Sequence, residues 1–227
     1  MQTQMLQKPD FGILKVVFDA PGETILCESG AMVSRSAEMQ MKTSMRGGLL
    51  AAAKRKLLGG ESIFQNTFTA TAPGQEIYLA ASPEGDIETM TLGAGQEFYL
   101  QSGAYLASES SVTLDTKFGG FKGFFGPGMF LVKMVGPGTF WFNSYGALHP
   151  VDVNGRFTCD NDHVVGFGPG LDYKVRAFGG MKGLFFSGEA LVCEFTGQGR
   201  LYAQTRRGPN LAAFLHPFRP VKSSNDD

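Results

Sequence analysis

The amino-acid sequence predicts an all-β protein that contains three similar domains in one chain. The first observation is a pattern that recurs three times, in which a short turn segment is followed by a glycine pair. Its copies are Ser29-Gly30-Ala31 with Gly47-Gly48, Ser102-Gly103-Ala104 with Gly119-Gly120, and Asn161-Asp162-His163 with Gly179-Gly180. A repeat of about 60 to 70 residues buries too little surface alone, so we expect the three domains to pack against one another.

Composition is the second observation that favours strands over helices. The chain has 31 glycines and 20 phenylalanines among 227 residues. This combination is typical of short strands that are joined by tight turns around aromatic packing. Helix is therefore expected to be scarce.

The third observation is a set of glycine-containing turns between β-prone segments. Glycine and asparagine tolerate the positive φ angles that tight turns require. The turns are Pro21-Gly22, Pro73-Gly74, Gly93-Ala94-Gly95, Pro137-Gly138, Asn154-Gly155 and Gly197-Gln198-Gly199. They predict six β-hairpins, two in each repeat.

The second strand of each repeat carries two apolar residues at matched positions. The pairs are Ile25 and Cys27, Phe98 and Leu100, and Phe157 and Cys159. Residues two apart share one face of a strand, so we expect Ile25, Phe98 and Phe157 to occupy equivalent inward positions. The aligned thiols of Cys27 and Cys159 are interpreted as small core residues and not as nucleophiles.

Domain boundaries follow from the repeats. The expected domains are residues 10–88, 89–149 and 150–207, followed by a C-terminal tail of residues 208–227. Between Gly48 and Pro73 the first repeat is eight residues longer than the others, and Ala51–Leu58 has the helix propensity to form a short basic helix there. Residues 1–8 are polar and expected to lie outside the fold, whereas 211–215 is the last segment apolar enough to pack.

The loops that follow the glycine pairs contain the candidate docking residues. In the first repeat the loop is basic, and in the other two an apolar cluster surrounds one lysine. The residues are Lys54, Arg55, Lys56, Phe121, Lys122, Phe124, Phe125, Lys182, Leu184, Phe185 and Phe186. Equivalent loops of related domains emerge at the same end, so they are expected to form one surface for a protein partner or an anionic membrane. Burial of the aromatic rings within the fold is the alternative.

Charge, targeting and cysteine usage exclude several classes of protein. The formal net charge is -1, with 20 basic and 21 acidic residues, so charge gives no signal for nucleic-acid binding. We find neither a secretory or transit segment nor an apolar run long enough to span a membrane. The three cysteines do not suggest a disulfide framework or a zinc site. A cytoplasmic location is expected.

The order of these motifs resembles a known family. It comprises Ser-Gly-Ala, Gly-Gly, a phenylalanine-rich Lys-Gly loop and Pro-Gly turns, and it closes with Gln204-Thr205-Arg206-Arg207. From about Gly12 to Arg207 it resembles the mitochondrial-biogenesis family named for altered inheritance of mitochondria. The resemblance implies a fold similar to that of the tryptophan RNA-binding attenuation protein (TRAP), a double-stranded β-helix-like β-sandwich. Three such domains would be fused with pseudo-threefold symmetry, and the family supplies no catalytic residues.

Signatures of catalysis and of cofactor binding are absent from the sequence. The three histidines are far apart, and there is no Gly-x-Ser-x-Gly, His-Glu-x-x-His or Walker motif. Residues 160–163, Asp-Asn-Asp-His, carry groups suited to a cation, but their position in the repeat favours a turn. Residues 82–88 are carboxylate-rich and are interpreted as a solvated linker. We therefore expect no enzyme, cofactor or metal site.

These observations favour an interaction or scaffold protein. Six hairpins present many strand edges, through which a homo-oligomer can also form. A binder of a small ligand or of a membrane surface is the alternative. RNA binding is a further alternative that rests on the fold analogy alone.

Overall fold

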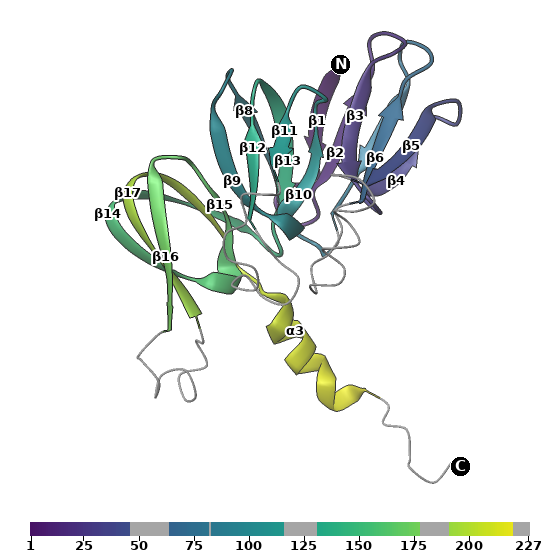
Figure 1. Ribbon diagram of the computed structural model, residues 1–227. Helices are drawn as coiled ribbons and strands as arrows, with labels where there is room; N and C mark the ends of the chain where they lie inside the picture. The colour runs from purple at the N-terminus through teal and green to yellow at the C-terminus, as the bar shows by residue number, and fades with distance from the viewer. Residues whose placement is uncertain (46–63, 82, 116–130, 178–190, 220–227) are drawn as a thin grey trace.

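The computed structural model describes residues 1–45, 64–81, 83–115, 131–177 and 191–219 (Figure 1). Its strands are β1 Gln2–Leu6, β2 Ile13–Val17, β3 Thr24–Glu28, β4 Met32–Arg35, β5 Gln40–Met45, β6 Phe64–Thr69, β7 Glu76–Leu79, β8 Ile87–Leu92, β9 Glu97–Gln101, β10 Tyr105–Ser108, β11 Thr113–Asp115, β12 Leu131–Val135, β13 Gly138–Asn143, β14 Leu148–Asp160, β15 Val164–Phe167, β16 Leu171–Ala177 and β17 Leu191–Gln204. The helical elements are η1 Ser102–Ala104, η2 Asn161–His163, α3 Gly208–Leu215 and η3 His216–Phe218. The expectation of an all-β chain with little helix is confirmed.

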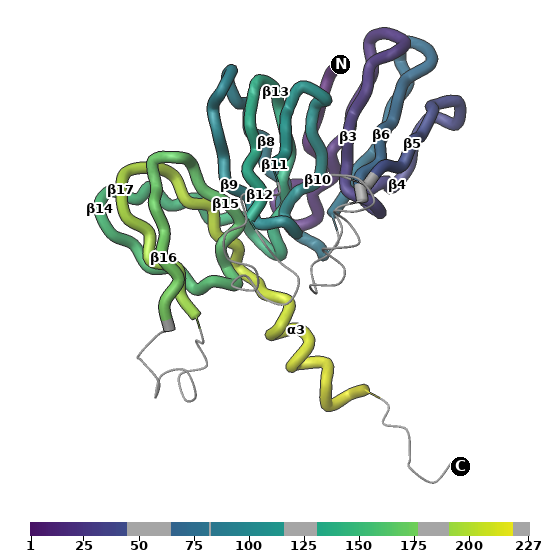
Figure 2. The backbone as a smooth tube through the Cα atoms, in the orientation of Figure 1, coloured from purple at the N-terminus to yellow at the C-terminus, as the bar shows by residue number. Residues whose placement is uncertain are grey.

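Strand pairing follows one order in three successive parts of the chain. In the first part the orders are β2-β7-β4 and β5-β6-β3, and in the second they are β8-β13-β10 and β11-β12-β9. In the third part β14 and β17 pair along their whole lengths, with β15 beside one half of β17 and β16 beside the other. Figure 2 shows β14 and β17 as continuous curved paths.

The glycine turns are where the sequence predicts them, but they do not form hairpins. Gly22 and Gly74 have φ angles of 89° and 75°, which favour glycine. The turn at Gly22 joins β2 to β3, however, and these strands belong to different sheets. At Gly155 and Gly197 the chain bends within β14 and β17. The hairpin prediction is wrong because turn chemistry fixes a local reversal and not the sheet that the next strand enters.

Two junctions join the three parts through sheet edges. Strand β3 pairs with β10, with Cys27 opposite Ala107. Strand β9 pairs with β15, with Leu100 opposite Gly166. A threefold arrangement would also require β4 to meet β14, but these strands lie at opposite sides of the molecule (Figure 1).

The core confirms most of the predicted inward positions and corrects one. Ile25 is 0% exposed and Phe98 is 3% exposed, but Phe157 is 38% exposed. Strands β3 and β9, which carry Ile25 and Phe98, are covered by β10 and β15. No strand of the described chain pairs with the outer edge of β14 beside Phe157. The prediction for Phe157 is therefore wrong because burial at this position depends on a neighbouring strand.

The chain ends differ from the expectation in two ways. Residues 1–8 are not outside the fold, because β1 pairs with β2 from Gln2 opposite Val17 to Leu6 opposite Ile13. Helix α3 projects from the sheets (Figure 1), and none of its residues is buried. The apolar segment 211–215 therefore does not pack onto the fold.

The acidic segment before β8 is more than a solvated linker. Asp86 is buried, its Oδ1 accepts a hydrogen bond from the amide of Ile87 at 2.8 Å, and the same oxygen lies 3.5 Å from Nζ of Lys8. Gly85 lies so close to the segment that follows β13 that an added Cβ would lie 1.9 Å from the carbonyl oxygen of Ser144. These contacts fix the segment against the start of the chain and against the segment that follows β13.

Candidate functional site

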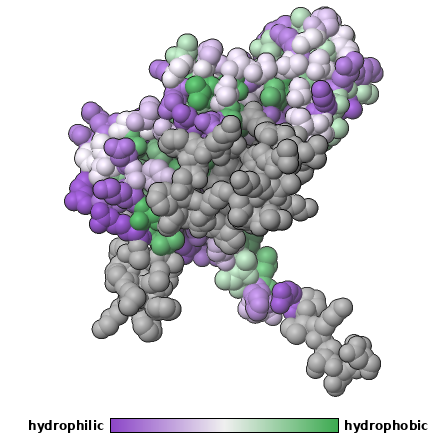
Figure 3. Space-filling model, viewed as in Figure 1, coloured by the Kyte–Doolittle hydropathy of each residue, from purple (hydrophilic) through white to green (hydrophobic). Residues whose placement is uncertain are grey.

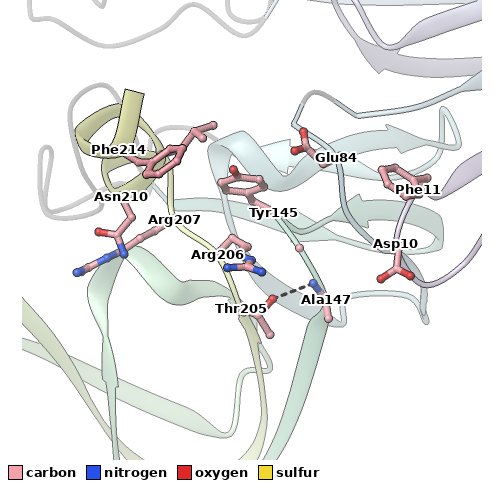
Figure 4. Close-up of a pocket in the computed structure, with 12 residues that line it drawn as sticks. Asp10, Phe11, Glu84, Tyr145, Ala147, Thr205, Arg206, Arg207, Asn210 and Phe214 are labelled. Atoms are coloured by element: carbon pink, nitrogen blue, oxygen red, sulfur yellow. Dashed lines mark hydrogen bonds between the residues drawn. The ribbon is translucent and has the colours of Figure 1, made fainter. Parts of the chain in front are cut away.

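A groove lies where the start of the chain, two connecting segments and α3 meet (Figure 4). Its volume is about 730 Å³, within the range of about 300–1,000 Å³ that small-molecule sites occupy. The lining residues are Asp10, Phe11, Glu84, Tyr145, Gly146, Ala147, Thr205, Arg206, Arg207, Asn210, Leu211 and Phe214. A smaller cavity of about 380 Å³ shares Phe11 and Glu84 with it.

Hydrogen bonds donated by backbone amides fix the floor of the groove. The amide of Ala147 donates to Oγ1 of Thr205 at 3.0 Å, and the amide of Arg206 donates to the carbonyl of Tyr145 at 3.1 Å. The amide of Gly146 donates to the carbonyl of Glu84 at 3.0 Å. Gly146 has a φ of 74°, and an added Cβ would lie 2.5 Å from Oγ1 of Thr205, so the close approach requires glycine. The floor is therefore a rigid platform.

Charges of both signs surround this floor. Arg206 and Arg207 follow β17, while Asp10 and Glu84 are on the other side of the groove (Figure 4). Arg207 is held by Asp160, with Nη1 2.9 Å from Oδ2. The groove thus lacks the uniform positive charge that a polyanion would need.

The rim of the groove is apolar and exposed. Phe11 lies on one side, and Phe214 of α3 lies on the other (Figure 4). Leu211 and Leu215 of α3 and Phe218 of η3 are also exposed, and the rings of Phe214 and Phe218 are 5.9 Å apart. Figure 3 shows this hydrophobic surface on the projecting helix. We call Leu211, Phe214, Leu215 and Phe218 the C-terminal apolar patch.

An eight-residue helix is only marginally stable in water without tertiary packing. Pro209 and Gly208 start α3, and no side chain provides an N-terminal cap. The fold buries none of its residues, so the helix gains little stabilisation from the rest of the chain. Helix α3 therefore lacks the tertiary packing that stabilises most short helices.

The docking residues predicted from the sequence lie outside the residues that the structure describes. They are Lys54, Arg55 and Lys56 in 46–63, Phe121, Lys122, Phe124 and Phe125 in 116–130, and Lys182, Leu184, Phe185 and Phe186 in 178–190, together with the helix expected at 51–58. The structure therefore does not test the surface that these loops were expected to form.

The cysteine thiols are poor nucleophiles in this fold. All three are free, and burial raises the pKa of Cys27 to about 12, of Cys193 to about 12 and of Cys159 to about 11. A thiolate is the reactive form, so these environments suppress its chemistry near neutral pH. The interpretation of Cys27 as a core residue is confirmed, whereas Cys159 is half-buried.

Residues 160–163 form the expected turn, as η2. Oδ1 of Asp160 accepts from the amide of Asp162 at 2.8 Å, and its other oxygen binds Arg207. Oδ1 of Asn161 accepts from the thiol of Cys193 at 3.2 Å. Structural contacts thus use these oxygens, and the described residues contain no group of three or more His, Cys, Asp or Glu side chains arranged for a metal.

Sequence reasoning did not identify the groove. Its residues come from four separate segments and form no motif. Two signals were present, because Gln204-Thr205-Arg206-Arg207 marks the end of the repeats and 211–215 is apolar. Neither signal indicates that the helix would leave the fold beside Phe11.

Comparison with known proteins gives consistent matches over most of the chain. The model of the family described as "Mitochondrial biogenesis AIM24" matches residues 3–206. An uncharacterised protein of Streptococcus pyogenes serotype M6 is 28% identical over 213 residues, which is 89% of this chain and 85% of that protein. A crystal structure of a Streptococcus pyogenes protein has a TM-score of 0.78 and 26% identity, and the match covers 96% of this chain and 99% of that one. Within the described residues, no helix has the length and apolarity to cross a membrane.

Proposed function

Because this chain belongs to the mitochondrial biogenesis AIM24 family, we propose that it is a non-enzymatic interaction or scaffold protein. The observation that carries the proposal is the C-terminal apolar patch, which projects from the sheets beside a groove with a rigid floor. Large exposed apolar patches mark interaction sites in soluble proteins. Aromatic residues dominate the energetic centres of such sites, so Phe214 and Phe218 are the main anchors.

A partner protein would gain from the geometry of this site in two ways. The apolar side chains of α3 would bury their exposed surface in a hydrophobic groove of the partner, a common mode of helix recognition. The charged side chains Asp10, Glu84 and Arg206 in the groove would then lie beside the bound partner and favour one orientation of it. The platform beneath Gly146 would hold the helix base in a fixed position.

Binding to a membrane surface is the second candidate. The C-terminal apolar patch lies between Arg206 and Arg219, so its rings can enter the lipid interface while the arginines meet anionic headgroups. A groove of about 730 Å³ also has room for a small ligand.

We infer three copies of one double-stranded β-helix-like unit, similar to TRAP, because the same strand-pairing order occurs in three parts of the chain. The copies would follow one another through the β3–β10 and β9–β15 junctions. We also infer a cytoplasmic location, which three free cysteines fit.

Affinity capture with matched variants tests the function. The wild type, Phe214→Ser/Phe218→Ser and Met41→Ser are each used as bait in native lysate and as ligand for vesicles. Met41 is a suitable control because it is 53% exposed on β5, away from the groove. We expect a protein that the wild type and Met41→Ser retain and the double variant loses.

The vesicle assay separates the two candidates. Retention on vesicles that contain phosphatidylserine, but not on pure phosphatidylcholine, with loss in the double variant, would support the membrane candidate instead. If a folded double variant retained every partner and all lipid binding, the C-terminal apolar patch would not be the functional surface.

A further inference from the structure

The two junctions inside the chain use the same pair of strand edges. At the first, β10 adds to the edge of β3, with Ala107 opposite Cys27 and Ser108 opposite Leu26. At the second, β15 adds to β9, with Gly166 opposite Leu100. When the three repeats are aligned on their turn segments, one position is occupied by Ser34, Ala107 and Gly166. Another position is occupied by Cys27, Leu100 and Cys159. Both junctions therefore pair the same two positions of the repeat.

Among the residues that the structure describes, the corresponding strands in the first and third parts of the chain have no such partner. They are β4, which corresponds to β10 and β15, and residues 156–160 of β14, which correspond to β3 and β9. Within the described chain, β4 and β14 each end the order of their sheet. The third pairing that the repeats predict, β4 with β14, is thus left unmade.

Apolar side chains on the two free edges are exposed, whereas the corresponding side chains at the internal junctions are buried. Val33 of β4 is 57% exposed, whereas the corresponding Leu106 and Val165 are both 0% exposed. Phe157 of β14 is exposed in the same way, in contrast to the buried Ile25 and Phe98. Apolar residues therefore occupy both free edges at the positions that the existing junctions bury. Unprotected edges of this kind are templates for pairing with another chain.

Geometry rules out closure within one molecule. Strands β4 and β14 lie at opposite sides of the structure in Figures 1 and 2, with the second part of the chain between them. The two edges are complementary but cannot reach each other within one molecule, whereas a second copy of the chain presents the complementary edge to each.

We propose that β4 of one copy pairs antiparallel with residues 156–160 of β14 of a second copy, and that this interface repeats the internal junctions. The expected register places Ser34 opposite Cys159 and Arg35 opposite Thr158. The interface is heterologous, because it joins two different edges, so each added copy presents a new free edge. Head-to-tail assembly then continues until a ring closes, or forms an open filament. This interface is distinct from the C-terminal apolar patch, and its test does not depend on the proposed function.

Solution mass of the full-length chain tests the assembly. We expect the wild type to show species that are multiples of 24.5 kDa and that grow with concentration, by light scattering after size-exclusion chromatography. Val33→Lys places a charge at the contact and should leave the 24.5 kDa monomer, with an unchanged circular dichroism spectrum. Met41→Lys, the matched control on β5, should assemble like the wild type. A wild type that stays monomeric at every concentration would overturn the proposal.

Oxidative cross-linking tests the register. Opposed residues of an antiparallel pair lie about 4.5–5.5 Å apart at Cα, a separation that a disulfide spans. Cys193 lies opposite Cys159 within the chain, so the test uses Ser34→Cys in a Cys193→Ala background. Copper–phenanthroline should give a ladder of reducible multimers that disappears when Cys159→Ser is added.

The neighbouring variant Val33→Cys in the same background is the register control, because the internal junctions pair the positions that correspond to Ser34 and Arg35, and not the position of Val33, with the partner strand. It should give much less cross-linking. Equal ladders from Ser34→Cys and Val33→Cys, or none from a folded Ser34→Cys variant, would overturn the proposed pairing.

Discussion

The rings of Tyr99 and Phe167 stack across the second junction, with centroids 5.2 Å apart and planes inclined by 22°. The two residues are also opposed in the β9–β15 ladder. Phe167 further contacts Phe195 edge-on at 5.2 Å. One side chain thus links the sheet junction to the core of the third part of the chain.

Replacement of Phe167 by Ala is expected to reduce the free energy of unfolding by about 3–5 kcal/mol, because the ring is fully buried and its loss leaves a cavity. Urea denaturation provides the measurement. Phe218→Ala removes an exposed aromatic ring and should change the free energy of unfolding by about 0.5 kcal/mol or less. Equal effects of the two variants would contradict the described packing.

Gly85→Ala should destabilise the protein through backbone contact. The new Cβ would lie 1.9 Å from the carbonyl oxygen of Ser144, so the two segments would have to separate. We expect a loss of about 1–3 kcal/mol, typical of a strained core substitution. Gly168→Ala is the matched control, since no atom lies within 4 Å of its added Cβ and its φ is not positive. Thermal unfolding distinguishes the two, and a neutral Gly85→Ala would show that the segments are not in close contact.

Deletion of residues 2–6 should lower Tm, because it removes β1 and exposes the edge of β2. We expect Tm to decrease by about 5 °C, which corresponds to a loss of roughly 2 kcal/mol in the free energy of unfolding for a chain of this size. Gln2→Thr/Gln4→Thr keeps the ladder and should leave Tm unchanged, as both side chains are exposed. An unaffected Tm after the deletion would restore the sequence-based expectation that this segment lies outside the fold.

Alkaline pH should weaken the fold through Cys27. Burial raises the pKa of its thiol to about 12, above the value of about 8.5 for an unfolded chain. At pH values between these two pKa values, the folded state binds more protons than the unfolded state. The free energy of unfolding therefore falls as pH rises. The free energy of unfolding should decrease from pH 8.5 to pH 11, and less steeply in Cys27→Ala. Parallel profiles for the two proteins would exclude this contribution.

The extent of sequence-based prediction differs between local and non-local features. Gly22 and Gly155 were predicted correctly because positive φ is a property of the residue itself. The hairpins were wrong, and so was Phe157, because sheet partners and edge burial depend on strands that are distant in sequence. Asp86 was assigned to solvent because its partner Lys8 lies far away in the chain. The groove was not predicted for the same reason, since no local pattern indicates that Phe11 and Phe214 lie at one site.

We propose that this protein acts by presenting α3 to another molecule. Site-specific photo-cross-linking in cells tests it most directly, with benzoylphenylalanine in place of Phe214 and, in a control, in place of Met41. We expect a discrete protein adduct from position 214 that is absent from position 41. No adduct at position 214 from a folded, expressed variant, or the same adducts from both positions, would contradict it.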